Sequence, residues 1–495
     1  MDWGFWLPVL VLATSALAAA LIFPLGERRI VARTTINMAA AVVKLGFVAI
    51  IFWGTFEGYV YETRLPFIPG LDFLLRVDPI SLVFVSLSAS LWLVTTIYAI
   101  GYLENSPRRS RFFGFFSLCV TATVGVALAG NLVTFFIFYE LLTLATYPLV
   151  VHRATEASLT GGRTYLMYTL SGGTVLLAAI IWLTVIAGPV EFTIGGVLGH
   201  IEETHRGELI AIFALFIAGL GVKAALVPLH GWLPAAMIAP APVSALLHAV
   251  AVVKAGAYGI IRVVYELYGL GLADTLGVLD PLAIVAGVTI LFGSVRALAQ
   301  DELKRRLAYS TVSQVSYIVL GVAIFGPLAT TGGLVHLVHQ GIMKITLFFC
   351  AGSLAETLEV HYVSEMNGVG RRMPLTMAAF TVAAFGMIGA PPIAGFVSKW
   401  YLGLGGIQAD RMWVVAVLAA STLLNAGYFL PILRAAWFKE PTHPWPAAEG
   451  RETRRSLLIP SLVTALASLA AGLFAASDFS PLFLARLIAE GMYWP

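Results

Sequence analysis

Most lysines of this chain lie where a charged group is costly. Five of its seven lysines fall inside long apolar segments, whereas only one of its 23 arginines does so. Arginine keeps its charge at any realistic pH, but a lysine that is deprived of water can give up its proton. A charge in hydrocarbon costs about 2.5–3.5 kcal/mol or more. We therefore expect these lysines to be paired or to carry protons: Lys44, Lys223, Lys254, Lys344 and Lys399.

The surroundings of the lysines differ. Lys223, Lys254 and Lys399 stand in segments rich in motifs, and we expect them to transfer protons. Lys344 is placed in the same group because histidines precede it. Lys44 has no motif around it, so we expect it to reach the membrane surface or to pair locally.

One acidic residue lies in the middle of an apolar segment, Glu140 in FFIFYELLTLATYPLV. At about 4 Å from a lysine and an effective dielectric constant near 20, the attraction would be about 4 kcal/mol. Movement of the carboxylate away from the lysine would then release the proton. We predict that Glu140 and Lys223 form such a switch, and a static ion pair between packed helices is the alternative.

Four histidines extend this series. HLVHQGIMK places His336, His339 and Lys344 on one helix, with His336 and Lys344 about 12 Å apart along its axis. His230 and His248 are explained equally well by packing and by proton transfer. The HxxH spacing also occurs in metal sites, but no third ligand is apparent nearby, so we predict no metal site. Side chains that can order water near this helix are Ser310, Thr311, Ser313 and Gln314.

Two apolar segments are interrupted at depth by proline. One is GVKAALVPLHGWLP, with Pro228 and Pro234, and the other is GMIGAPPIAGFVSKWYLG, with Pro391 and Pro392. Proline removes a backbone hydrogen bond, which a membrane tolerates only where the freed backbone is buried in protein or lines a wet cavity. Broken helices in both halves of a chain predict an inverted-repeat transporter with its ion path at the breaks.

Composition requires that these segments lie in a membrane. The chain has 495 residues, of which 59% are hydrophobic and 12% charged, too little charge for a soluble domain of this size. Its connectors are short and carry no phosphate-binding or dinucleotide motif, so we expect no cofactor, no catalytic group and no nucleic-acid partner. A membrane helix needs about 20 apolar residues. Fourteen such spans are predicted, at 7–23, 35–53, 79–101, 112–129, 132–151, 164–187, 209–228, 243–261, 281–299, 307–324, 329–355, 377–400, 412–433 and 457–475.

The basic residues of the connectors predict an orientation. Alternate connectors form a poor set with six cationic residues, Arg64, Arg76, Arg206, Arg262, Arg411 and Arg486. By the positive-inside rule the rich set is cytoplasmic, which puts both termini on the extracytoplasmic side of a prokaryotic plasma membrane. The rich set has 18 members: Arg28, Arg29, Arg33, Arg108, Arg109, Arg111, Arg153, Arg163, Lys304, Arg305, Arg306, Arg371, Arg372, Arg434, Lys439, Arg451, Arg454 and Arg455.

Four stretches carry a family resemblance that covers essentially the whole chain. They are FYELLTLATYPLV, GVKAALVPLHGWLPAAMIAPAPVSALLHAVAVVKAGAYG, LKRRLAYSTVSQVSYIVLG and GAPPIAGFVSKWYL. They resemble the antiporter-like subunits shared by respiratory complex I, Mrp-type cation/proton antiporters and membrane-bound hydrogenases. ELLTLATYPLV and GFVSKWYL look most like the Mrp D subunit and its hydrogenase counterparts. LHGWLPAA and SALLHAVAVVKAG are closer to the redox-linked members.

The resemblance implies an all-α membrane fold of about fourteen helices. Helices 4–8 and 9–13 would form two inverted repeats, with helices 7 and 12 discontinuous. The corresponding ranges here are 1–110 for three N-terminal helices, 111–265 and 280–437 for the repeats, and 456–495 for the last helix. By motif, Glu140, Lys223, Lys254 and Lys399 match the family's residues on helices 5, 7, 8 and 12, and His336, His339 and Lys344 fall in its polar helix 11.

These observations lead to a functional hypothesis with one main rival. We predict a proton-translocating subunit of a multisubunit Na⁺/proton antiporter, with protons passing Glu140 and Lys223, then Lys254, the histidines and Lys344, and leaving near Lys399. The rival is the same channel in a redox-driven complex, such as an NADH or ferredoxin:quinone oxidoreductase or a hydrogenase. Both predict other membrane subunits as partners. An autonomous carrier of an organic solute is disfavoured because no substrate-sized polar site is apparent.

Overall fold

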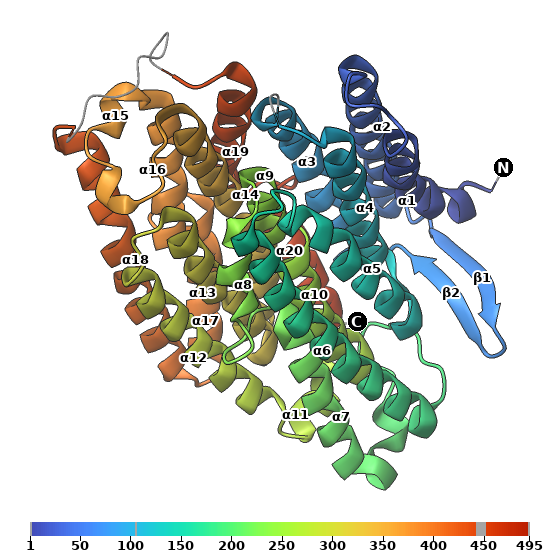
Figure 1. Ribbon diagram of the computed structural model, residues 1–495. Coiled ribbons are helices and arrows are strands. Elements are labelled where there is room, and N and C mark those ends of the chain that lie inside the picture. The colour runs from blue at the N-terminus through green and yellow to red at the C-terminus, as the bar shows by residue number, and fades with distance from the viewer. Residues whose placement is uncertain (1, 104–105, 442–451, 494–495) are drawn as a thin grey trace. The chain divides into compact units, whose positions relative to one another are not determined.

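The computed structural model describes residues 2–103, 106–441 and 452–493 (Figure 1). Arg451, one of the arginines used to predict orientation, lies outside these ranges. The chain forms two compact units. It passes from one unit to the other within α3 (Pro79–Tyr102), in the turn after Lys223 and at the break before Val252.

Unit 1 comprises residues 1–96, 105–225 and 250–282. Besides most of α3 it contains α1 (Trp3–Ile22), α2 (Ile30–Phe56), β1 (Glu62–Ile68), β2 (Leu71–Arg76), α4 (Arg109–Leu128), α5 (Leu132–Val150), α6 (Glu156–Ala187), η1 (Gly199–Ile201), α7 (Glu202–Lys223), α10 (Val252–Arg262), η3 (Val263–Tyr268) and α11 (Leu270–Thr275).

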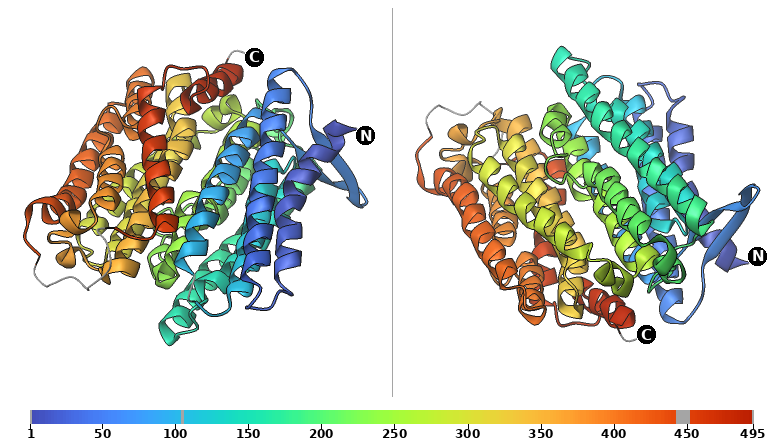
Figure 2. Two further views of the ribbon diagram at one scale, coloured as in Figure 1. Left: turned by 90° about the horizontal axis from the view of Figure 1, so that it is seen from above. Right: turned by 90° about the horizontal axis from the view of Figure 1, so that it is seen from below.

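Unit 2 comprises residues 97–104, 226–249 and 283–495. Its elements are α8 (Trp232–Ala235), η2 (Ala236–Ile238), α9 (Ala241–Ala249), most of α12 (Leu279–Leu298), α13 (Leu303–Ala323), α14 (Pro327–Leu358), η4 (Val363–Glu365), α15 (Val369–Arg372), α16 (Pro374–Ile388), α17 (Ala394–Gln408), α18 (Met412–Phe438), α19 (Arg455–Leu473) and α20 (Pro481–Tyr493). Within this unit α14 packs against α13, α16, α17 and α19, and Figure 2 shows α14 and α19 side by side.

The prediction of an all-α membrane fold is confirmed. Within the described ranges, twelve helices are long and apolar enough to cross a membrane, so the chain is a multi-span membrane protein. The exact count of fourteen is not confirmed. The two other predicted spans fall on α13, whose first turn carries Lys304, Arg305 and Arg306, and on the pair α16 and α17.

The predicted interruptions are present. Helix α7 ends at Lys223, and the chain continues in turns as far as α8. Helix α16 ends at Ile388, the next residue Gly389 adopts a φ of +96°, and five residues separate α16 from α17, which begins at Ala394. A third break was not predicted, because no proline or glycine marks it: Val250 and Ala251 separate α9 from α10.

A short hairpin was also missed in the sequence. Strands β1 and β2 are antiparallel and joined by Pro69 and Gly70, and Gly70 adopts a φ of +82°. Proline followed by a glycine with positive φ is the signature of a type II turn. In Figure 1 the hairpin extends beside α1, and we call the side of unit 1 that carries it the hairpin face.

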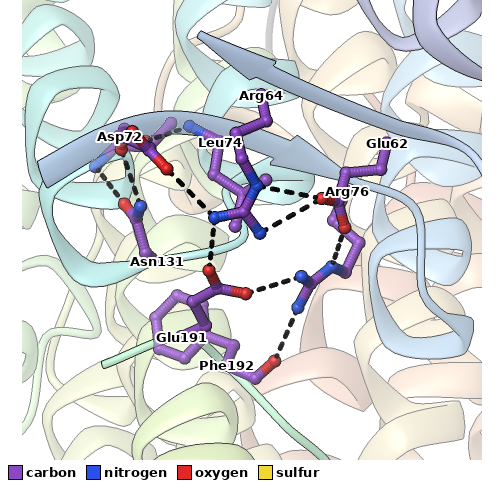
Figure 3. A network of polar contacts seen from close by, with 9 residues as sticks. Glu62, Arg64, Asp72, Leu74, Arg76, Asn131, Glu191 and Phe192 are labelled. Carbon is purple, nitrogen blue, oxygen red and sulfur yellow. Dashed lines mark hydrogen bonds and ion pairs between the residues drawn. The ribbon is translucent and has the colours of Figure 1, made fainter. Parts of the chain in front are cut away.

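Ion pairs tie the hairpin to the connector that follows α6 (Figure 3). Arg64 contacts Asp72 at 3.0 Å and Glu191 at 2.7 Å, while Arg76 contacts Glu62 at 2.7 Å and Glu191 at 2.6 Å. The hydrogen bond from Arg64 is the main cause that lowers the pKa of the Glu191 carboxyl. Glu191 therefore stays ionised, and both arginines stay engaged, at pH values below the usual range for a glutamate.

The backbones of α10 and α7 approach each other closely at Gly256. A Cβ atom added there would overlap the amide nitrogen of Ala224 and lie 2.7 Å from the carbonyl carbon of Lys223. Close backbone approach through small residues is how membrane helices gain van der Waals contact. The absence of a side chain at Gly256 thus holds the broken end of α7 against α10.

We predict that Gly256→Ala destabilises the protein, because the added methyl group must push two backbones apart. Overpacking of this kind costs about 1–3 kcal/mol. The control is Gly271→Ala, since nothing lies within 4 Å of a Cβ atom added at that residue. Thermal unfolding in detergent should show a lower transition temperature for Gly256→Ala alone, and equal transition temperatures would contradict this account of the packing.

Candidate proton path

Lys223 is the last residue of α7 and is fully buried. Its ammonium group donates a hydrogen bond to the carbonyl oxygen of Tyr139 on α5, and it lies 3.3 Å from the centre of the Tyr139 ring. A carbonyl and an aromatic face both attract a cation without carrying a full negative charge. The site can therefore hold the lysine in either protonation state.

Glu140 follows Tyr139 on α5 and is only partly buried. Its carboxylate lies against α6 at Gly173, where an added Cβ atom would overlap Oε1. Glu140 and Lys223 interact electrostatically, but they form no contact ion pair within 4.0 Å. The static ion pair considered above is thus not observed, and Lys223 rests on a backbone carbonyl instead.

Unit 1 contains two further buried lysines. Lys254 is fully buried in the first turn of α10. Lys44 does not reach the surface: it is fully buried, donates a 2.6 Å hydrogen bond to Ser15 on α1 and lies 4.9 Å from the ring centre of Trp92. Of the two expectations for Lys44, local pairing is confirmed.

In unit 2, Lys399 faces the broken end of α16. Its ammonium group donates to the carbonyl oxygens of Met387 at 3.0 Å and Ile388 at 2.7 Å, the last two residues of that helix. Carbonyl groups at a helix C-terminus lack partners within the helix and carry a partial negative charge. The break therefore creates the acceptor that a buried lysine needs.

Lys344 lies on α14 and faces α13. It donates to Ser310 Oγ at 2.9 Å and makes a longer contact of 3.4 Å with the carbonyl oxygen of Leu307. Ser310 is one of the hydroxyl residues singled out in the sequence, and it provides the first step of a longer connection.

Two residues of α18 link Lys344 to Lys399. The Tyr428 hydroxyl lies 2.9 Å from Ser310 Oγ and 2.8 Å from Asn425 Oδ1. Asn425 Nδ2 donates to the Met387 carbonyl oxygen at 3.1 Å, which also accepts from Lys399. A continuous chain of polar contacts thus joins the two buried lysines. Sequence reasoning missed Asn425 and Tyr428, although their spacing of three residues places them on one helix face.

The histidines are buried to different degrees. His336 Nδ1 lies 2.7 Å from Ser398 Oγ, next to Lys399 in sequence, and the His336 ring is 5.2 Å from that of Tyr317. His339 is fully buried beside the backbone of Ala394. His248 is also fully buried, with its ring centre 4.6 Å from that of Phe348, and His230 is half-buried against Phe292. The structure thus places His336 and His339 near the start of α17.

Arg262 was assigned to a connector by its charge, which is wrong. Its side chain is 1% exposed, and it contacts Asp78 at 2.6 Å and Glu266. Glu266 is equally buried in the π-helical segment η3, near the end of the span Ala241–Tyr268. The roles of all these residues in proton transfer stay predictions. Among the described residues, no three His, Cys, Asp or Glu side chains gather where they could hold a metal ion.

Comparison with known proteins places these features in a family. The family model described as "NADH:quinone oxidoreductase/Mrp antiporter, TM" matches residues 129–425, and a second model, "NADH-Ubiquinone oxidoreductase (complex I), chain 5 N-terminus", matches residues 70–113. NADH-quinone oxidoreductase subunit N of Desulforudis audaxviator is 36% identical over 418 residues, which cover 81% of this chain and 82% of that protein.

Solved structures share the fold. A chain of the Mrp complex from Dietzia sp. DQ12-45-1b superposes with a TM-score of 0.82 at 24% identity, covering 100% of this chain and 98% of that one. A chain of the membrane-bound sulfane sulfur reductase, an archaeal respiratory membrane complex, gives a TM-score of 0.85 at 21% identity, with 98% of each chain covered. With the broken helices, the buried lysines and the matched ranges together, the chain belongs to the NADH:quinone oxidoreductase/Mrp antiporter family of antiporter-like membrane subunits.

Proposed function

We propose that this chain carries protons across the membrane along its buried lysines. The observation that supports this proposal most directly is the chain of contacts from Lys344 through Ser310, Tyr428 and Asn425 to the acceptor carbonyl of Lys399. A polar connection of this length is costly in a membrane protein unless it has a task. Proton transfer fits the chemistry of Ser310 and Tyr428, whereas Asn425 and the Met387 carbonyl cannot relay a proton and instead orient the groups around Lys399.

The members of this chain have different roles. The lysine amines bind and release protons, and the hydroxyls of Ser310 and Tyr428 can accept a proton on oxygen while they give up their own. Tyr428 has a single hydrogen, so it can donate to Ser310 or to Asn425 but not to both. Asn425 and the Met387 carbonyl fix the acceptor geometry at Lys399, and rotation of the Tyr428 hydroxyl would open or close the connection.

In unit 1 we assign proton loading to Lys223 and Glu140. Because the two groups are apart, movement of Glu140 toward Lys223 would stabilise the ammonium form and movement away would favour release. The full path proposed is the predicted one, from Glu140 and Lys223 through Lys254, His336, His339 and Lys344 to Lys399, with His230 and His248 as accessory groups. The two inverted repeats, 111–265 and 280–437, and extracytoplasmic termini are part of this proposal.

The host complex is proposed from the relatives. We propose that the chain works beside other membrane subunits, because its relatives belong to multisubunit complexes. The 36% identity with an NADH-quinone oxidoreductase subunit favours a redox-driven host, in which this chain would be the pump module without catalytic groups. The fold shared with a chain of the Mrp complex supports the second candidate, a Na⁺/proton antiporter.

We predict that Lys223→Ala abolishes proton transport while the complex still assembles, because alanine fills less space and cannot bind a proton. The control is Lys439→Ala, which removes an exposed lysine after α18. Acidification of inside-out vesicles, monitored with a pH-sensitive dye, measures both variants. Normal transport by Lys223→Ala would end the relay hypothesis.

Tyr428→Phe tests the connection in unit 2. The ring still packs 4.6 Å from Phe429, but the hydroxyl that joins Ser310 to Asn425 is lost. We expect the rate of proton transport to fall by about ten-fold or more. A positioned acid or base contributes about 10²–10⁴-fold, and a single hydroxyl in a longer path is expected to contribute less. Tyr401→Phe, at a half-exposed tyrosine of α17, is the control, and equal rates for the two variants would exclude Tyr428 from the path.

Analysis of the native complex distinguishes the two hosts. We expect purification in a mild detergent to recover subunits that contain iron–sulfur clusters or flavin in stoichiometric amount, as a redox-driven host requires. Mass spectrometry with iron and flavin determination is the measurement. Small hydrophobic companions without iron or flavin, together with sodium-dependent proton flux, would establish the antiporter instead.

A further inference from the structure

Polar side chains occupy every fourth position along α10 and η3. Lys254, Tyr258, Arg262 and Glu266 follow one another at this spacing, and each is at most 1% exposed. Residues four apart lie on the same side of a helix, one turn above the other. We call these four residues the α10 ladder. It begins at the buried lysine of the proposed path and ends beside the connector that carries Glu191 and Phe192.

The three outer members of the ladder, Tyr258, Arg262 and Glu266, are in contact or share a partner, and Lys254 lies one turn before Tyr258 on the same side of the helix. Tyr258 and Arg262 both donate to the carbonyl oxygen of Ala127 on α4, at 2.8 and 3.2 Å, and the Arg262 guanidinium lies 5.0 Å from the centre of the Tyr258 ring. Arg262 then pairs with Glu266. Glu266 lies in a π-helical turn, a rare geometry that is frequent at functional sites.

The outer end of the ladder has one negative charge too many. Arg262 faces two carboxylates, Asp78 at 2.6 Å and Glu266, and a single guanidinium neutralises only one of them. Tyr258 is the other titratable group at this cluster. Arg76 is the next cation that faces Glu266, but it is engaged by Glu62 and Glu191 (Figure 3). Two carboxylates that share a buried site cannot both remain ionised cheaply, and one bound proton restores the balance.

Asp78 is the most exposed member of this cluster. Its side chain is 16% exposed, compared with 2% for Glu266 and 1% for Arg262. Asp78 accepts a 2.8 Å hydrogen bond from the Ser81 amide, so it caps the start of α3 and its place is fixed. A proton that reaches Asp78 is thus one ion pair away from the fully buried Glu266.

We propose that the α10 ladder and Asp78 form a second proton branch, which connects Lys254 to the hairpin face of unit 1. A proton binds at Glu266, which shares Arg262 with Asp78. The Tyr258 hydroxyl turns away from the Ala127 carbonyl and gives its own hydrogen to the Lys254 amine, and the Tyr258 oxygen takes up the proton from Glu266 in exchange. Arg262 keeps its charge throughout and holds the two carboxylates in place. This proposal rests on the proposed function, because it supplies protons to Lys254 of the same path.

Infrared difference spectroscopy of the purified native complex tests the shared proton without any need for transport. Spectra recorded at acidic and alkaline pH should contain the C=O band of a protonated carboxylic acid, and Glu266→Gln and Asp78→Asn should each remove it. Glu202→Gln, at a partly exposed carboxylate that pairs with Arg206, is the control and should keep the band. A band that survives in both Glu266→Gln and Asp78→Asn would overturn the proposal. A band that disappears on addition of sodium at constant pH would also overturn it, because the site would then bind a cation.

Transport by Tyr258→Phe tests the branch itself. The ring still packs 4.7 Å from Phe84, but the hydroxyl is lost. The matched control is Tyr268→Phe. Tyr268 lies on the same helical segment as Tyr258 but outside the ladder, and its buried hydroxyl donates to the Leu209 carbonyl on α7. We expect proton transport to fall by about ten-fold or more in Tyr258→Phe alone.

The outcomes separate this proposal from the one on which it rests. If Lys223→Ala abolishes transport while Tyr258→Phe and Tyr268→Phe transport equally, the ladder is not a branch and the main path stands. If Lys223→Ala transports normally, the proposed function fails, and the infrared band still decides whether the carboxylates share a proton. If Glu266→Gln does not assemble, Asp78→Asn and Tyr258→Phe give the same two readouts with less disturbance of the core.

Discussion

An amine or a guanidinium inside a bilayer has to find its hydrogen-bond acceptors within the protein, because the lipid offers none. Most features of this chain answer that requirement. Lys223 donates to the carbonyl of Tyr139, Lys399 to the last carbonyls of α16, and Arg262 to two carboxylates and a carbonyl. Only the arginine has a formal counter-ion. The lysines rest on neutral acceptors, which suits the proton transfer proposed for them.

A broken helix supplies the acceptors of Lys399. Most carbonyl groups of an intact helix bond within the helix, whereas those of the last turn lack such partners. By ending α16 at Ile388, the chain leaves carbonyl groups free where Lys399 lies. Lys223 stands at the broken end of α7 but rests on a carbonyl inside the unbroken helix α5. The close approach at Gly256 keeps the free end of α7 in position, so the breaks and the buried lysines are structurally linked.

The sequence predicted the parts of the site that depend on one segment alone. The breaks near Pro228 and Pro391 follow from the lost hydrogen bonds of proline, and the depth of Lys223 and Lys399 follows from the apolar residues around them. Asn425 and Tyr428 could not be found in this way, because their meaning comes from Ser310 on another helix. Arg262 was misplaced because a charge at the end of an apolar run usually marks a loop. Here Asp78, from a distant part of the chain, pairs with Arg262 and offsets the free-energy cost of burying its charge.

The pairing of Lys44 with Ser15 bears on how the protein enters the membrane during synthesis. Lys44 lies near the middle of α2, and its side-chain nitrogen donates a hydrogen bond to Ser15 on α1. If α2 left the insertion machinery alone, its lysine would face lipid without a partner. With only seven residues between α1 and α2, the two helices can leave together as a hairpin, with Lys44 already bound. In such a pair, Ser15 would lower the cost of inserting the helix that follows it.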